Sequence, residues 1–409
     1  MFLDILLFML LGILFGTATG LIPGIHPNTI FMLMASAAVL AYSIPTELLL
    51  VFIMALAVSN TFTDFLPSII FGAPDPSTAL SVLPGHSFLL GGRGYEAIVL
   101  TVIGGLGVAL MTVLTLPMLI YLIPLAYALI RPVIHILLLA VAAWMVATEP
   151  GWRKIPALIV FLLAGIFGVV SLNGFPSAVS VFPALTGMFA MSTLIVSCSI
   201  RTSVPPQERP DEIAGDHRKG ILTGWLAGWF AGMLPGVGAA QAGVLAAHSL
   251  RASMRDFLTA LGGINTSNIL FTFIIFYTIG KTRSGATWAV SQVADSIGTW
   301  EMTLLVFVGI TACFISALTT LGLGRLLLGR IRSVNYRALN LGVIAVLIAL
   351  TAILTGPVGM LILATGTFIG LLAVASGVRR SQLMGYLLLP TMLYFSGISP
   401  TIMLMMGMW

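Results

Sequence analysis

Polar side chains that can bind a cation lie inside a long apolar stretch near the start of the chain. Asn60, Thr61 and Asp64 fall within the apolar segment 46–72, and Asp75 follows shortly after it. Ionisable residues at such positions are costly and usually functional. Carboxylate oxygens suit Na⁺ or a proton, and neutral oxygens complete a cation cage. We therefore predict a coupling-cation site at Asn60, Thr61, Asp64 and Asp75, with Asp64 as the metal ligand if the ion is Na⁺; for Asp75 an aqueous loop is an equal alternative.

A second group of residues surrounds two Pro-Gly pairs, Pro23-Gly24 and Pro235-Gly236, which interrupt apolar segments. Proline removes a backbone donor, and such breaks survive in a membrane only where they line protein or a cavity. A half-helix that begins after the break offers free N–H groups to an anion. The alternative is a packing kink, and for His26 a histidine satisfied by the broken backbone. The predicted substrate site comprises Gly24, His26, Asn28, Thr29, Gly236, Gly238 and Gln241, with Asn265, Thr266 and Asn268 from a second polar run.

The same motifs indicate an internal duplication. The Pro-Gly pairs are 212 residues apart (235 − 23), and the pairs Asn60-Thr61 and Asn265-Thr266 are 205 apart (265 − 60). Two matches in the same order are the signature of a repeat. The longest hydrophilic stretch separates the two halves. We therefore predict a first transmembrane repeat over 1–200, a cytoplasmic linker over 201–219 and a second transmembrane repeat over 220–409.

The composition indicates that this protein lies in a lipid bilayer. The 409 residues are 59% hydrophobic and 8% charged, with a mean hydropathy of +1.11. Too few polar residues remain to cover a water-exposed surface, which excludes a cytosolic enzyme, a secreted domain and a disordered protein. The apolar runs are continuous, which excludes an alternating transmembrane barrel. The sequence predicts an all-α polytopic membrane protein with about 10 to 14 membrane segments.

The basic residues predict the orientation of these segments. Arg325, Arg330, Arg332 and Arg337 crowd one loop, whereas the first Lys or Arg of the chain is Arg93. Cytoplasmic loops carry the excess of basic residues, so the crowded loop is predicted to be cytoplasmic and the N-terminus extracytoplasmic. The net charge of +5 is therefore a topology signal, and we expect no nucleic-acid partner. Counting segments between the loops gives two repeats of inverted topology with broken helices, which is a common plan of secondary transporters.

The sequence resembles the large membrane subunit of tripartite tricarboxylate transporters, the TctA family. The similar stretches are GLIPGIHPNT, FGAPDPSTALSVLPGHSFLLGGRG, and GMLPGVGAAQAG with its downstream INTSN. They span most of the chain in the family's order, and the compact length is similar to that of archaeal-type members. The resemblance implies a multi-pass protein of the plasma membrane that acts as a cation-coupled carboxylate symporter. It also implies two partners, a small membrane subunit and an extracytoplasmic substrate-binding protein.

Together these features favour a secondary permease for a small organic anion, a di- or tricarboxylate, coupled to Na⁺ or H⁺. The sequence contains no Walker, GxSxG or HExxH motif, so we predict no enzyme activity and no cofactor besides the coupling ion. One alternative is a translocase for a lipid-linked or other phosphate-bearing anion, since a helix N-terminus also suits phosphate. Another is an intramembrane enzyme with Asp64 and Asp75 as an acid/base pair, although Pro67, Gly72 and Pro74 interrupt a helix joining them. A structural assembly factor would not need two matched broken helices.

Overall fold

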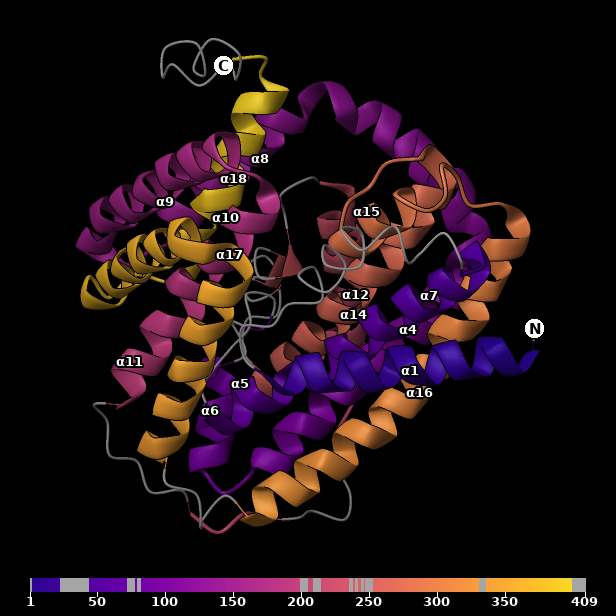
Figure 1. The fold of residues 1–409 in the computed structure, drawn as a ribbon, viewed down its shortest axis with the longest axis horizontal. Helices are drawn as coiled ribbons and strands as arrows, with labels where there is room; N and C mark the ends of the chain where they lie inside the picture. Colours follow the sequence, from indigo (N-terminus) through magenta and orange to yellow (C-terminus); the bar gives the residue numbers. More distant parts are fainter. Residues whose placement is uncertain are drawn as a thin grey trace. The chain divides into compact units, whose positions relative to one another are not determined.

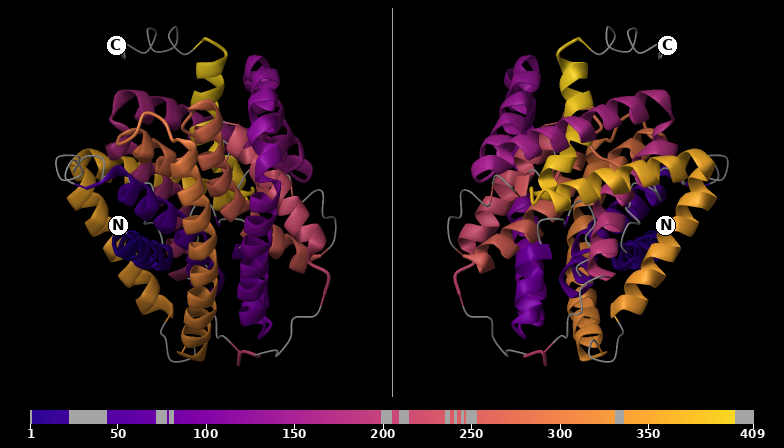
Figure 2. Two further views of the ribbon diagram at one scale, coloured as in Figure 1. Left: turned by 90° about the vertical axis from the view of Figure 1, so that its right-hand side faces the viewer. Right: turned by 90° about the vertical axis from the view of Figure 1, so that its left-hand side faces the viewer.

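The computed structural model describes most of the chain, and its regular elements are helices (Figures 1 and 2). The described residues are 2–22, 44–71, 78, 82–198, 205–208, 215–234, 238–239, 242–243, 246, 253–330 and 336–398. Eight of the described helical stretches are long and apolar enough to cross a membrane. One of them, Gly94–Ala147, has 54 residues, whereas a single crossing needs about 20. The prediction of an all-α polytopic membrane protein is confirmed.

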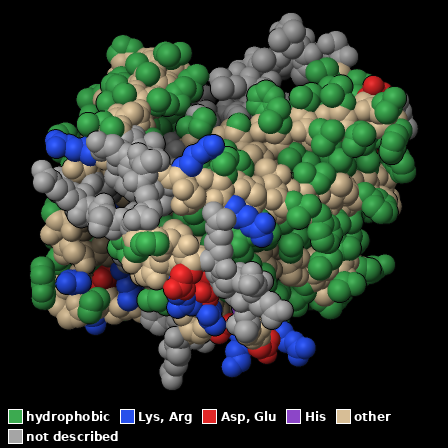
Figure 3. Space-filling view, turned by 90° about the horizontal axis from the view of Figure 1, so that it is seen from below, with side chains coloured by type: hydrophobic (Ala, Val, Ile, Leu, Met, Phe, Trp, Pro, Cys, Tyr) green, Lys and Arg blue, Asp and Glu red, His purple; other side chains and the backbone are tan. Residues whose placement is uncertain are grey.

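The apolar surface agrees with a membrane location. Large hydrophobic side chains such as Leu114, Ile353 and Phe368 are more than two-thirds exposed within the described part of the chain. Figure 3 shows hydrophobic side chains over wide areas of one face, with Lys, Arg, Asp and Glu gathered over a part of it. Apolar patches of this extent mark an interaction with a membrane or a protein. Because these residues sit on the predicted spans, lipid is the solvent that they require.

The chain divides into two compact units. The first unit comprises Met1–Leu125, Thr202–Met233 and Gly238–Val334. Its elements are α1 (Phe2–Leu21), α4 (Thr46–Thr63), α5 (Phe65–Phe71), α6 (Val82–Leu90), most of α7 (Gly94–Ile130), α12 (Arg218–Met233), α14 (Met254–Ile279), α15 (Gly285–Ser291) and α16 (Thr299–Arg330).

The second unit comprises Ala126–Arg201, Leu234–Val237 and Asn335–Trp409. It contains the end of α7, the short 3₁₀ helices η2 (Arg131–Val133), η3 (Gly151–Arg153) and η6 (Arg380–Met384), the π-helical turn η4 (Thr186–Met191), and the helices α8 (Ile134–Ala147), α9 (Lys154–Gly174), α10 (Ser177–Leu185), α11 (Ser192–Cys198), α17 (Tyr336–Ala375) and α18 (Gly385–Phe395). Helix α17 is interrupted at Gly356, whose φ of 62° is readily available to glycine, immediately before Pro357.

The helices recur at the spacing of the sequence motifs. Helices α1 and α12 end 212 residues apart (233 − 21), and α7 and α16 begin 205 apart (299 − 94). These are the same offsets that separate the Pro-Gly and Asn-Thr pairs. The unit boundaries after residues 125 and 334 are themselves 209 apart (334 − 125). Each compact unit thus takes matching pieces from both sequence halves. The division into repeats over 1–200 and 220–409, and their opposite orientation in the membrane, stay predictions.

Glycines bring two helix pairs of the first unit into close contact. Helix α1 lies along α4 (Figure 1), and a Cβ added at Gly16 would stand 2.4 Å from the Leu56 carbonyl oxygen. Helix α12 lies along α14 in the same way, because a Cβ at Gly228 would stand 1.7 Å from Ser267 Oγ. Small residues spaced four apart allow such backbone approach in membranes. The close approach fixes the position of α4, which carries Asn60 and Thr61, against α1. It fixes the position of α14, which carries Asn265 and Thr266, against α12 in the same way.

An ion-pair cluster joins two helix starts in the first unit. Glu96, in the first turn of α7, is 4% exposed. Its carboxylate accepts hydrogen bonds from Arg93, at 2.7 and 2.8 Å, and Arg255 Nε at the start of α14 lies 2.6 Å away. Arginine-carboxylate pairs with low exposure are the ones that contribute to stability. The cluster fixes α7 against α14 at the ends of both helices.

Candidate functional site

The described residues cover one part of the predicted sites. Asn60, Thr61 and Asp64 lie on or next to α4, and Asn265, Thr266 and Asn268 lie on α14, all in the first unit. Gly238 is also described, and its carbonyl accepts a hydrogen bond from the Ala242 N–H at 3.2 Å, as in a helical turn. The remaining predicted residues lie outside the described part of the chain: Gly24, His26, Asn28, Thr29, Asp75, Gly236 and Gln241.

Asp64 stands at a break between two helices. Helix α4 ends at Thr63 and α5 begins at Phe65, and the Asp64 N–H still bonds to the Asn60 carbonyl at 3.0 Å. The cause is Pro67, which has no N–H to donate to the carbonyl four residues earlier and whose ring crowds that carbonyl. Three residues before Asp64, the Thr61 carbonyl accepts a hydrogen bond from the Asn265 side chain. Asp64 is only 2% exposed.

A hydrogen-bond network connects Asp64 to α14. Asn265 Nδ2 donates to Asp64 Oδ2 at 2.8 Å and to the Thr61 carbonyl at 3.3 Å. The Thr61 and Thr266 hydroxyl oxygens lie 3.2 Å apart. These four residues are each at most 4% exposed. The result is a carboxylate, a backbone carbonyl and two hydroxyls gathered inside the protein, between two stretches long and apolar enough to cross a membrane. They are oxygen groups of the kind that hard cations prefer.

The two threonines occupy equivalent positions of the predicted duplication. Thr61 and Thr266 are 205 residues apart (266 − 61), the offset that relates the two Asn-Thr pairs. A contact between equivalent residues is what a two-fold relation between two copies produces, because there the same patch meets itself. Their asparagine neighbours differ in their contacts. Asn265 bonds to Asp64, whereas Asn60 Nδ2 donates to Thr19 Oγ1 on α1 at 3.2 Å.

Glycines on α7 and α14 bring this cluster together. A Cβ at Gly104 would stand 1.9 Å from the Thr259 carbonyl oxygen, and a Cβ at Gly262 would stand 2.1 Å from that of Thr101. A Cβ at Gly105 would stand 2.9 Å from Thr266 Oγ1. Sequence reasoning overlooked these residues and Thr19. The paired glycines at 104–105 and 262–263, inside apolar segments, were the available signal, because small residues mark close helix crossings in membranes.

Asn268 makes no side-chain hydrogen bond to the described residues of the cluster. It is partly buried, and its backbone N–H lies next to Gly228 of α12. The described residues contain no group of three or more His, Cys, Asp or Glu side chains placed to hold a metal ion. Within the described part of the chain, a cation near Asp64 would find one carboxylate and neutral oxygens as ligands. Such a donor set suits a monovalent ion or a proton better than a divalent metal.

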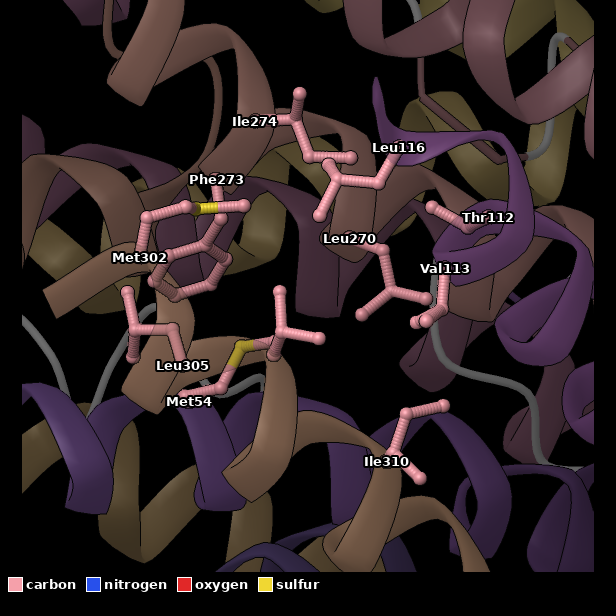
Figure 4. A pocket seen from close by; sticks show the side chains of 11 residues that line it. Met54, Thr112, Val113, Leu116, Leu270, Phe273, Ile274, Met302, Leu305 and Ile310 are labelled. Atoms are coloured by element: carbon pink, nitrogen blue, oxygen red, sulfur yellow. The ribbon is translucent and has the colours of Figure 1, made fainter. Parts of the chain in front are cut away.

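An apolar cavity of about 30 Å³ lies elsewhere in the first unit (Figure 4). Side chains from four helices line it, among them Met54, Leu270, Phe273 and Met302, with Thr112 supplying the one hydroxyl. A carboxylate in such a cavity would lack hydrogen-bond donors, and burying an unpaired charge is very unfavourable. The cavity therefore does not suit the predicted anion.

Comparison with known proteins assigns the family. Residues 6–385 match the family described as Tripartite tricarboxylate transporter TctA family. The chain belongs to the TctA family. It is also 30% identical over 402 residues to the uncharacterized protein MJ1079 of Methanocaldococcus jannaschii, covering 95% of this chain and 98% of that protein. No solved structure matches the chain. As a TctA-family member with membrane-crossing helices, it is a multi-pass membrane protein and a component of a transport system.

Proposed function

We propose that this TctA-family protein is a secondary permease for a small organic anion, a di- or tricarboxylate, driven by Na⁺ or H⁺. The observation that carries the proposal is the Asp64 carboxylate, which is 2% exposed, belongs to a stretch long and apolar enough to cross a membrane, and accepts a hydrogen bond from Asn265. A buried carboxylate is retained there against a high desolvation cost. If a cation binds to this carboxylate and leaves it in each transport cycle, the carboxylate has a function that explains why it is retained.

Electrostatics assign Asp64 to the cation rather than to the substrate. Two unit charges about 4 Å apart interact by about 4 kcal/mol at an effective dielectric constant of about 20. A substrate carboxylate next to Asp64 would be repelled by that amount, and a cation would be attracted. The Thr61 carbonyl and the Thr266 hydroxyl would supply neutral ligands. We place the substrate at the half-helix N-termini predicted after Gly24 and Gly236, where free N–H groups would favour an anion.

Coupling follows if both ions bind in the same cycle. A bound cation offsets the negative charge of the substrate, so each ligand raises the affinity of the other by the same factor. Membership of the TctA family supports two further proposed partners, a small membrane subunit and an extracytoplasmic protein that delivers the substrate. These subunits would raise the supply of substrate without changing the ion requirement of the membrane subunit.

The test is transport and binding by the purified chain. Uptake of labelled citrate, succinate and other carboxylates into liposomes is measured with a Na⁺ gradient, with a proton gradient and with neither. Because partner subunits can limit uptake, substrate-induced thermal stabilisation is measured in parallel, with and without Na⁺. Asp64→Asn should lose the cation dependence and keep weak substrate binding. The matched control is Asp216→Asn, which removes a well-exposed carboxylate.

Three results would contradict the proposal. One is the failure of all carboxylates to bind or enter under any gradient. Another is preferential movement of a phosphate-bearing lipid or anion, which would favour a translocase instead. The third is unchanged cation dependence in Asp64→Asn, which would make Asp64 a structural residue and leave Asp75 as the next candidate for coupling.

A further inference from the structure

Arg380 in the second unit is held by neutral oxygens. It begins η6, the short 3₁₀ helix that follows α17. Its Nη1 donates to the Phe189 carbonyl at 3.1 Å and to the Thr193 hydroxyl. Both acceptors belong to the continuous helical segment 177–198, and Phe189 lies in the π-helical turn η4. π-helical turns inside α-helices are uncommon and occur frequently at functional sites.

The positive charge of Arg380 lacks a carboxylate partner among the described residues. None of their acidic groups lies within ion-pair distance of it. The neighbouring acid, Glu149, accepts instead from the Arg379 backbone N–H at 3.0 Å and from Gln382 Nε2 at 3.3 Å. Burial lowers the pKa of Arg380 to about 10, so the guanidinium stays charged at neutral pH. A partly buried cation is normally paired, because leaving it unpaired is costly.

The chain around Arg380 contacts charges of both signs, the Glu149 carboxylate at the Arg379 N–H and a second arginine near Gly377. The Arg153 guanidinium carbon lies 3.6 Å from the position of a Cβ built at Gly377, three residues before Arg380. Ser381, the next residue in the chain, is 3% exposed, and its hydroxyl has no hydrogen-bond partner within the described structure. A buried hydroxyl without a partner costs about 1–3 kcal/mol. A ligand that accepts hydrogen bonds and carries negative charge would pair with Arg380.

We propose that Arg380 binds one carboxylate of the transported anion through the Nε–Nη2 edge of its guanidinium. Nη1 is occupied by Phe189 and Thr193, whereas Nε and Nη2 make no hydrogen bond to another described residue. These two N–H groups point in parallel and match the two oxygens of a carboxylate, which is the strongest geometry for this pair. The proposal rests on the proposed carboxylate transport and adds a binding residue that the sequence motifs did not indicate.

The experiment compares three substitutions in the full-length protein. Arg380→Gln removes the charge and the fork, and Arg380→Lys keeps the charge but presents no planar pair of donors. Arg379→Gln is the matched control, because its side chain is exposed and adjacent in sequence and reaches only Thr148 Oγ1, at 3.5 Å. For each variant, citrate binding is measured by thermal stabilisation and calorimetry, and KM and Vmax are measured by uptake into liposomes. The unliganded unfolding midpoint serves as the check of folding.

The expected result is graded. Arg380→Gln should raise the citrate Kd and KM at least tenfold. The Kd and KM of Arg380→Lys should lie between those of Arg380→Gln and the wild type, and those of Arg379→Gln should stay within twofold of the wild type. If Arg380→Gln does not fold, Arg380→Lys carries the test, and it should weaken citrate binding severalfold with an unchanged unfolding midpoint.

Three outcomes would overturn the inference, and they are distinguishable. A wild type that binds and transports carboxylates, with Arg380 variants of unchanged Kd, overturns the role of Arg380 alone. An Arg379→Gln variant that loses as much affinity as Arg380→Gln also overturns it, because the effect would then come from general surface charge. A wild type that binds no carboxylate at all overturns the proposed function together with this inference.

Discussion

The contact between Asp64 and Asn265 can be tested by exchanging the two side chains. Aspartate and asparagine have nearly the same shape, so Asp64→Asn combined with Asn265→Asp keeps one carboxylate facing one amide across the 2.8 Å contact. The single variants do not. Asn265→Asp places two carboxylates against each other, and Asp64→Asn places two amides against each other. The exchange therefore measures the interaction itself rather than the volume of either residue.

The magnitudes follow from the burial and the distance. Two carboxylates that relax to about 4 Å would repel by up to about 4 kcal/mol at an effective dielectric constant of about 20. They can avoid this only by sharing a proton, so Asn265→Asp should lose more stability at about pH 8 than at about pH 5. Asp64→Asn exchanges a charge-assisted hydrogen bond for a neutral one but also removes a buried charge, so its net change should stay below about 1.5 kcal/mol. The double variant should recover most of the loss of Asn265→Asp but stay about 1–2 kcal/mol below the wild type, because an aspartate at position 265 cannot donate to the Thr61 carbonyl as Asn265 does.

The assay is unfolding of the purified protein in detergent, followed by intrinsic fluorescence over a range of pH. The four proteins of the cycle give an interaction energy, which we expect to be about 2 kcal/mol or more in favour of the exchanged pair. Cation-stimulated uptake is then measured on the double variant. An interaction energy near zero, or an Asn265→Asp variant that is as stable as the wild type at high pH, would refute the contact and with it the network that positions Asp64.

Three further predictions concern the fold. Gly104→Ala should lower the stability by about 3 kcal/mol, seen as a lower unfolding midpoint, because its Cβ would meet a backbone carbonyl of α14, whereas Gly342→Ala has open space and should be neutral. Glu96→Gln should lower the unfolding midpoint and reduce its dependence on salt, because two arginines lose their partner, whereas Asp216→Asn on the surface should change neither. Cysteine at Gly215 should react with an impermeant maleimide only after the cells are opened, and efficient labelling of intact cells would reverse the predicted orientation.

Much of the fold follows from local sequence properties. Apolar stretches about 20 residues long can cross a membrane only as helices, so the helical class was predictable from composition alone. The two motif offsets anticipated the spacing at which α1 and α12 end and at which α7 and α16 begin. The break at Asp64 also follows from sequence, because Pro67 removes a hydrogen bond of the preceding turn. These features depend on residues close together in the chain.

The contacts that build the candidate site could not be predicted from local sequence patterns. Sequence patterns assigned Asn265 and Thr266 to the substrate and Asp64 to the cation, and the structure places both groups of residues in one network. Their meeting depends on how closely α7 approaches α14, which is set by glycines 40 or more residues away from Asp64. Arg380 was missed for a similar reason. Its partners on the segment 177–198 are nearly 190 residues away, and no local pattern signals that pairing.

The predicted duplication, with a carboxylate at only one of the two equivalent positions, supports a proposal of one coupling site rather than two. The position equivalent to Asp64 in the second half is Ile269 (269 − 64 = 205), so the negative charge occurs once although the surrounding Asn-Thr pair occurs twice. Near a two-fold relation, equivalent threonines meet each other, and a group present in only one copy breaks the symmetry at that point. Asn265 from the second half bonds to this charge, whereas its counterpart Asn60 bonds to Thr19 within the first half. A cation that binds Asp64 would thus change the contacts of Asn265 but not those of Asn60. The second half of the chain would sense the ion that the first half binds, which is what coupling between two repeats requires.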